Sequence, residues 1–163
     1  MDTPLHTLCA QLGALLQQQQ RMLATAESCT GGLIAAACTE LAGSSAWFER
    51  GFVTYSNAAK TSMLGVDADL LATHGAVSEP VARAMARGAL QHAHAQVSLA
   101  VTGIAGPSGG SAYKPVGTVW LAWGLPGGIT SEHYHFSGDR AAVRAATVVQ
   151  ALSRLLVLLK AQA

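Results

Sequence analysis

The stretch MLATAESCTGG, residues 22–32, joins a short apolar run to small polar residues and two glycines. The run 22–26 predicts a buried strand because it is short, uncharged and bounded at once by turn-forming residues. The residues 28–32 offer helix caps and a tight turn, and Leu33–Leu41 then has a helical pattern. A strand that passes through a glycine turn into a helix is the building unit of α/β folds.

The same order of strand, turn and helix recurs further along the chain. Gly51–Tyr55 predicts a second strand, followed by a short helix that Asn57 can cap and that carries Lys60. The other expected elements are a first helix over 5–16, a helix over 79–94, a third strand over 97–102, a hairpin of strands 117–123 and 129–136, and a last helix over 140–160. This order predicts a single α/β domain over residues 1–163 with a mixed sheet.

Composition limits the classes of function. The chain has 163 residues, 50% of them apolar and 12% charged, with a net charge of +1 and no basic stripe, so we expect no nucleic-acid partner. Three cysteines without a CxxC pair favour a reducing compartment. The N-terminus lacks a basic signal-peptide region, and the apolar run 152–159 is too short for a bilayer, so we expect a cytoplasmic protein with no membrane contact.

Polar, glycine-rich sequence follows each of the three predicted strands. The residues concerned include Ser28, Thr30 and Gly31 after the first strand, Asn57 after the second, and Thr102 with Gly103 after the third. Ligands of open α/β sheets bind beyond the carboxyl ends of the strands, where glycines let backbone N–H groups approach them. These three segments are therefore expected to line one crevice, although any one of them alone could be a simple turn.

The sequence offers serine, cysteine and lysine residues as candidates for a catalytic nucleophile and its base. Lys60 is one of only three lysines, and Ser45 precedes it by fifteen residues across the predicted strand 51–55. A buried lysine of lowered pKa can take the proton of a serine hydroxyl, so a fold-back of the chain would make these two a catalytic pair. Lys60 could equally be a solvated helix residue, and Ser44 could take the place of Ser45. Cys29, at a helix N-terminus, is a second candidate nucleophile.

Two charged or metal-binding patterns remain. Arg140 and Arg144 lie one helical turn apart at the start of the last helix, where a bound phosphate would offset their conflict with the helix dipole; they could also be ordinary surface arginines. His133 and His135 share a strand face, but no third ligand accompanies them, so we expect no metal.

Six segments in order resemble the CinA C-terminal domain family over about residues 5–158. They are AESCTGG (26–32), GSSAWFERGFVTYSNAAK (43–60), HGAVSEPVA (74–82), VTGIAGPSGG (101–110), KPVGTVW (114–120) and FSGDRAAVR (136–144). The chain is most similar to stand-alone bacterial members, which hydrolyse the carboxamide of nicotinamide mononucleotide to nicotinate mononucleotide and ammonia in the recycling of NAD. The resemblance does not extend to the N-terminal domain of longer members, so we do not expect the pyrophosphatase activity of that domain.

The resemblance implies a three-layer α/β/α fold, a homodimer, and an amidohydrolase that uses neither a metal nor another cofactor. It implies Ser45 as the nucleophile, Lys60 as its base and Tyr55 beside them to orient the lysine or relay a proton. Ser28 and Thr102 would contribute hydroxyls around the amide, and Arg140, with Arg144 as a second candidate, would bind the phosphate or the carboxamide. The alternative is a nucleotide-binding or competence- and damage-associated module without catalysis.

Overall fold

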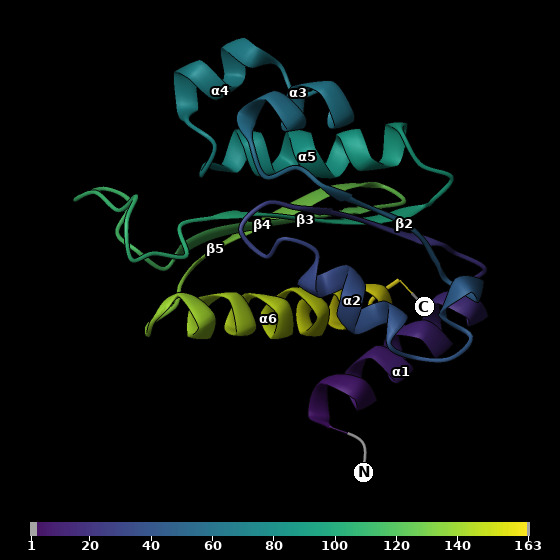
Figure 1. Ribbon diagram of the computed structural model, residues 1–163. Helices are drawn as coiled ribbons and strands as arrows, with labels where there is room; N and C mark the ends of the chain where they lie inside the picture. The colour runs from purple at the N-terminus through teal and green to yellow at the C-terminus, as the bar shows by residue number, and fades with distance from the viewer. Residues whose placement is uncertain (1–2, 163) are drawn as a thin grey trace.

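The computed structural model describes residues 3–162 as one mixed sheet with helices on both faces (Figure 1). The predicted ends of the domain at residues 1, 2 and 163 lie outside the described residues. The elements in chain order are α1 (Pro4–Gln18), β1 (Leu23–Glu27), α2 (Leu33–Thr39), the short 3-10 helix η1 (Ser44–Ala46), β2 (Phe48–Val53), α3 (Asn57–Leu64), α4 (Ala68–His74), α5 (Glu79–Gln91), β3 (Val97–Gly103), β4 (Thr118–Leu125), β5 (Gly128–His135) and α6 (Arg140–Lys160).

The sheet has five strands in the order β2-β1-β3-β4-β5. β1 runs parallel to both β2 and β3, whereas β4 runs antiparallel to β3 and β5. Every residue of β1 is buried, as expected for a parallel strand covered on both faces. The predicted α/β fold with a mixed sheet is thus confirmed, and the carboxyl ends of β1, β2 and β3 meet at one edge.

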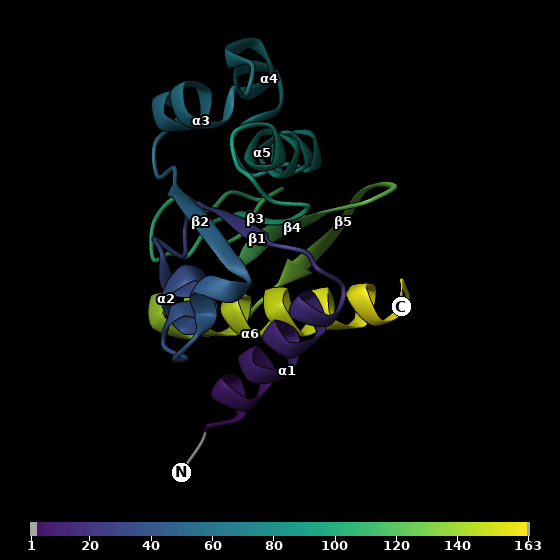
Figure 2. The ribbon, with the colours of Figure 1, turned by 90° about the vertical axis from the view of Figure 1, so that its right-hand side faces the viewer.

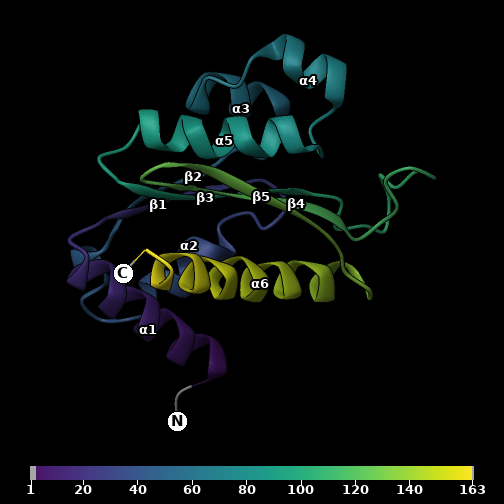
Figure 3. The same ribbon diagram turned by 180° about the vertical axis from the view of Figure 1, so that it is seen from behind.

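Helices α1, α2 and α6 cover one face of the sheet and α3, α4 and α5 cover the other (Figures 1, 2 and 3). Alternation along β1 and β3 divides their side chains between the two cores: Leu99 and Val101 pack on the α6 side, while Ala26 and Ala100 pack on the α5 side. Ser28 and Thr102, two residues further along each strand, continue the rows on the α5 side. This alternation directs their hydroxyls toward α3 and α5.

Helix α6 is long and apolar enough to cross a membrane by length and composition alone, with a mean hydropathy of 1.6. Its apolar face, which includes Val143, Leu152 and Leu155, is buried in the core beneath the sheet. A long core helix of this kind passes the same test of length and composition. No other described helix in residues 3–162 does so.

Three local predictions differ from the structure. The second strand is Phe48–Val53 rather than 51–55, because Phe48 already pairs with Leu23 of β1. Ser56 rather than Asn57 is the N-cap of α3, since its hydroxyl accepts the N–H of Ala59 at 3.0 Å. Helix α4, which Asp67 caps through its carboxylate, is only seven residues long and was not predicted.

Candidate active site

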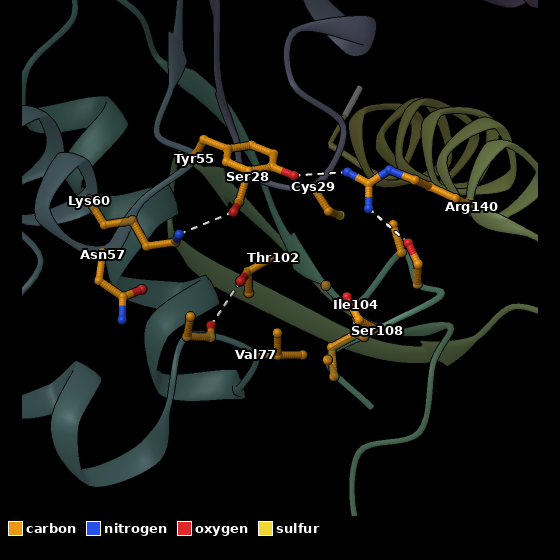
Figure 4. A pocket seen from close by; sticks show the side chains of 15 residues that line it. Ser28, Cys29, Tyr55, Asn57, Lys60, Val77, Thr102, Ile104, Ser108 and Arg140 are labelled. Carbon is orange, nitrogen blue, oxygen red and sulfur yellow. Dashed lines mark hydrogen bonds between the residues drawn. The ribbon is translucent and has the colours of Figure 1, made fainter. Parts of the chain in front are cut away.

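A cavity of about 260 Å³ opens at the edge where β1, β2 and β3 end (Figure 4). Its walls come from the segments that follow these three strands, together with the loop between α4 and α5 and the start of α6. The expected site residues that line it are Ser28, Tyr55, Asn57, Lys60, Thr102, Gly103 and Arg140. The structure therefore brings three distant segments to one crevice.

Lys60 lies on the second turn of α3 and is only 1% exposed. Its Nζ donates to the carbonyl of Thr54 at 3.1 Å and lies 3.1 Å from Oγ of Ser28. Burial lowers the pKa of the Lys60 ammonium, and the nearby Cys29 thiol opposes this shift to a smaller extent. Lys60 is thus a buried amine suited to act as a base, and not a solvated helix residue.

Ser28 is the first residue after β1, and 8% of it is exposed. Its backbone N–H donates to the carbonyl of Val101 at 3.1 Å, which extends the β1–β3 ladder by one residue. The backbone of Ser28 is therefore fixed by the sheet while its hydroxyl meets Lys60. A serine hydroxyl beside a buried amine of lowered pKa has the arrangement that a nucleophile and its base require.

Ser45 does not meet Lys60, so the expected pairing of these two residues is wrong. Ser45 is exposed in η1, before β2 begins, and Lys60 follows the opposite end of the same strand. The five steps from Phe48 to Val53 span about 16 Å at roughly 3.3 Å per residue. The chain does not fold back between them, because β2 pairs in parallel with β1 from Phe48 to Val53, with one irregularity near its start. Ser44 is buried at the same distant end.

Glu27 holds the turn that follows Ser28. Its buried carboxylate accepts the hydroxyl of Thr30 at 2.6 Å and the backbone N–H groups of Ile34 and Ala35 at 2.9 and 3.1 Å. The negative charge lies at the N-terminus of α2, where the helix dipole favours it. Thr30 is therefore turned toward Glu27, and neither it nor Gly31 lines the cavity as had been expected.

Arg144 holds the same turn from the other side. Its Nε donates to the carbonyl of Cys29 at 3.0 Å and its Nη2 to the carbonyl of Thr30 at 3.3 Å. Arg144 does not line the cavity, so the structure gives it a backbone-holding role in place of the expected contact with substrate. The carboxylate of Glu27 and the guanidinium of Arg144 together satisfy donors and acceptors of one turn.

Arg140, one turn earlier on α6, faces the cavity. Its Nη1 donates to the carbonyl of Gly106 and its Nη2 to the hydroxyl of Tyr55, each at 2.8 Å. Tyr55 is 59% exposed, and its hydroxyl is directed to Arg140 rather than to Lys60 (Figure 4). A guanidinium has five N–H donors, so Arg140 keeps donors for an anionic ligand group.

Thr102 and Cys29 complete the inner wall. Oγ1 of Thr102 donates to the carbonyl of Ala76 at 2.8 Å. Burial raises the pKa of the Cys29 thiol to about 11, which keeps it protonated near neutral pH. A protonated thiol is a poor nucleophile, so the structure favours Ser28 over Cys29.

No cluster of three or more His, Cys, Asp or Glu side chains within residues 3–162 is placed to hold a metal ion. His133 stacks on Trp120, with 4.9 Å between the ring centroids, and His135 contacts the carbonyl of Val116 at 3.0 Å. These histidines lie on β5 at the far edge of the sheet, away from the cavity.

Two contributions to the site were missed from the sequence. Glu27 stands within the ESCTGG segment, and a carboxylate directly before a glycine turn and a helix was a usable signal for a helix cap. The carbonyls of Thr54 and Ala76 leave no signal, because any residue type supplies a backbone carbonyl.

Comparison with known proteins decides the family. The model of the CinA C-terminal domain matches residues 5–159. The chain belongs to the CinA C-terminal domain family. It is 55% identical to the nicotinamide-nucleotide amidohydrolase PncC of Pseudomonas putida, over 95% of this chain and 97% of that protein. It is 54% identical to the protein of the same name in Escherichia coli K12, over 94% of each chain.

Solved structures in the CinA C-terminal domain family agree with this fold. The competence/damage inducible protein CihA of Agrobacterium tumefaciens has a TM-score of 0.93 at 48% identity, over 97% of both chains. A CinA superfamily protein of Klebsiella pneumoniae also has a TM-score of 0.93, at 40% identity, over 97% of this chain and 99% of that chain. The layered arrangement of helices and sheet is thus that of the family.

Proposed function

We propose that this CinA-family protein hydrolyses the carboxamide of nicotinamide mononucleotide to nicotinate mononucleotide and ammonia. The observation that carries the proposal is the contact between the buried Lys60 amine and the Ser28 hydroxyl inside a cavity of about 260 Å³. The names of relatives that are 54–55% identical over nearly their whole length support the same chemistry. In this proposal Ser28, and not the expected Ser45, is the nucleophile.

In the first half of the reaction, neutral Lys60 accepts the proton of Ser28 as its Oγ bonds to the carboxamide carbon. The carbonyl π electrons move to oxygen and form an oxyanion. The backbone N–H group of Cys29, which follows Ser28 on the cavity wall, is the donor we assign to it. Loss of such donors costs on the order of a hundredfold or more in rate.

The intermediate then collapses. The ammonium of Lys60 returns its proton to the amide nitrogen, the C–N bond breaks, and ammonia leaves an ester on Ser28. Lys60, neutral again, removes a proton from water as the water oxygen attacks the ester carbon. The bond to Ser28 breaks, the serine oxygen regains a proton from Lys60, and the nicotinate nucleotide departs. No redox partner is needed, because every step moves only protons and bonding pairs.

The rim of the cavity supplies the contact for the nucleotide phosphate in this proposal. Arg140 is held by Gly106 and Tyr55, which fixes the direction of its guanidinium while some of its donors stay free. Bidentate contacts between guanidinium and phosphate add both energy and orientation. Asn57, at the N-terminus of α3, lies on the same cavity wall.

The direct experiment measures ammonia and nicotinate mononucleotide formed by the purified protein from nicotinamide mononucleotide, with and without a metal chelator. We expect equal amounts of both products, unchanged by the chelator. Free nicotinamide serves as the control substrate and should react poorly, since it lacks the phosphate. A folded protein that binds the nucleotide without releasing ammonia would contradict the proposal and favour a nucleotide-binding module.

The cytoplasmic location and the homodimer stay predictions. Analytical ultracentrifugation of the purified protein would test the second, and cell fractionation would test the first.

A further inference from the structure

The hydroxyl of Thr102 has only one proton, and the fold already uses it. Oγ1 of Thr102 lies 2.8 Å from the carbonyl oxygen of Ala76, and a carbonyl oxygen can only accept, so Thr102 must be the donor. Toward any other neighbour, this hydroxyl can offer only its lone pairs.

The acceptor that takes this proton is itself held in place. Ala76 lies between α4 and α5, in a loop closed by the hydroxyl of Ser78, which donates to the carbonyl of Gly75 at 2.8 Å. Nζ of Lys114 donates to the carbonyl of His74, the last residue of α4 before this loop, at 3.0 Å. These bonds hold the loop that carries the Ala76 carbonyl. The fold therefore keeps the Thr102 hydroxyl as a donor to Ala76 and as an acceptor toward the cavity.

Thr102 lies beside the reacting group of the proposed mechanism. β1 and β3 are parallel, with Glu27 opposite Val101, and the next residues along the two strands are Ser28 and Thr102. Neighbouring strands are about 4.8 Å apart, and residues in register point to the same face. Both side chains line the cavity together with Lys60, and Thr102 is only 1% exposed, so little water reaches its hydroxyl (Figure 4).

We infer that Thr102 is a specificity-determining residue that accepts a hydrogen bond from the NH2 group of the substrate carboxamide. The inference rests on the proposed function and deepens it. A carboxamide has donor hydrogens on nitrogen, whereas the carboxylate of the product has only acceptor oxygens. When the amide is replaced by carboxylate, the lone pairs of Thr102 face an oxygen instead of an N–H.

Two consequences follow for the reaction. The contact orients the carboxamide, with nitrogen toward Thr102, so its oxygen is directed to the backbone N–H group of Cys29. The same contact becomes repulsive after hydrolysis, which weakens the binding of nicotinate mononucleotide relative to nicotinamide mononucleotide. Thr102 thereby favours entry of the amide and release of the acid.

The test compares the affinities of these two nucleotides without turnover. Calorimetry measures both dissociation constants for Ser28→Ala, and again for Ser28→Ala combined with Thr102→Val or Thr102→Ala. Removing the acceptor should strengthen the binding of nicotinate mononucleotide relative to nicotinamide mononucleotide by about tenfold. This is the effect expected of one unsatisfied polar contact. Thr102→Ser keeps the hydroxyl and should keep the ratio close to that of the parent.

Thr118→Val is the matched control, because Thr118 also donates its hydroxyl to a carbonyl, that of Pro115 at 2.6 Å, but lies outside the cavity wall. It should leave the ratio unchanged. Equal loss of affinity for both nucleotides in Thr102→Val and Thr102→Ala would overturn the inference, because a merely structural role would produce that result. If the wild-type protein released no ammonia, the proposed function would be wrong. If it released ammonia but the Thr102 variants left the ratio of the two dissociation constants unchanged, only this inference would be wrong.

Discussion

The two ends of β2 present the same residue types in contrasting surroundings. At its amino end, Ser45 lies exposed in η1, close to a strand whose second and third residues, Glu49 and Arg50, form a partly buried ion pair. At its carboxyl end, the chain enters α3 and buries Lys60 against Ser28. Hydroxyls occur at both ends, but among the described residues only the carboxyl end places a buried amine beside a hydroxyl on a cavity wall.

The difference comes from the sheet topology. Parallel strands β1, β2 and β3 all end at one edge, so the turns after them converge, whereas the segments that enter them begin at the opposite edge. A serine that precedes a strand and a lysine that follows it are thus separated by the length of that strand. A side chain that meets Lys60 at this edge therefore follows one of these strands, as Ser28 does.

Replacement of Lys60 should have the largest effect at the carboxyl end. Lys60→Met keeps the length of the side chain but removes the base, so we expect kcat to fall by about a thousandfold. Ammonia release measures this loss, with Lys160→Met, on the exposed end of α6, as the control. Near-normal turnover in Lys60→Met would contradict the assignment of the base.

The same substitution should stabilise the fold. Because burial lowers the pKa of Lys60, the unfolded chain binds its proton more tightly than the folded chain. Stability of the wild type therefore rises with pH between the lowered pKa and the ordinary lysine value near about 10.4. The advantage of Lys60→Met in urea unfolding should be greatest below the lowered pKa and shrink as the pH approaches that upper value. An advantage independent of pH would contradict this explanation.

Activity should depend on pH in the same direction. The neutral form of Lys60 is the base, so kcat/KM should rise with pH through the lowered pKa of this residue and then level off. The profile is measured for nicotinamide mononucleotide at constant ionic strength. A rate that falls across this range, with the protein still folded, would show that the ammonium form is required.

Loss of the guanidinium that holds the turn should have an intermediate effect. Arg144→Gln removes the bonds to the carbonyls of Cys29 and Thr30, so Ser28 loses part of its fixed position. We expect kcat to fall by between about tenfold and a hundredfold with little change in KM, as for displacement of a reacting group. Arg87→Gln, on the exposed side of α5, is the control. A large rise in KM with unchanged kcat would instead indicate that Arg144 binds the substrate.

A smaller effect is expected from the partner of Arg140. Tyr55→Phe removes the hydroxyl that accepts from the guanidinium, so Arg140 is held by one bond fewer. KM for nicotinamide mononucleotide should rise by about threefold to tenfold, the scale of one hydrogen bond, with kcat nearly unchanged. Tyr113→Phe is the matched control, because Tyr113 is 97% exposed. A loss of kcat in Tyr55→Phe would support the proton relay first expected of Tyr55.

The smallest effect should come from the thiol on the cavity wall. Cys29→Ala removes a group whose pKa is raised to about 11, so it takes no nucleophile away, and most of the turnover should remain. Steady-state ammonia release provides the measurement. Complete loss of activity in a folded variant would reinstate Cys29 as a nucleophile.

Much of the fold could be predicted because its local signals agree with its topology. The buried run 22–26 and the glycine turn after it correspond to β1 and the start of α2, and α6 begins at the predicted Arg140. The start of β2 was predicted three residues too late, because Phe48 and Arg50 pair with Leu23 and Ala24 of β1 and so extend the strand. Such pairing is a tertiary effect that no local pattern contains.

The site could be predicted only in part, for the same reason. Three strand ends were expected to share a crevice, and they do. Spacing along the chain suggested Ser45 for Lys60, but the parallel alignment of β1 with β2 places Ser28 there instead. The roles of Arg140 and Arg144, four residues apart on one helix, diverge because one guanidinium meets the cavity and the other meets carbonyls of the turn.

One measurement tests the central claim most directly: ammonia release from nicotinamide mononucleotide by Ser28→Ala and Ser45→Ala, side by side with the wild type. The account predicts that Ser28→Ala loses at least about a thousandfold in rate while it keeps its fold and its affinity for the nucleotide. Ser45→Ala should match the wild type. Activity retained in Ser28→Ala and lost in Ser45→Ala would contradict the account and return the nucleophile to the amino end of β2.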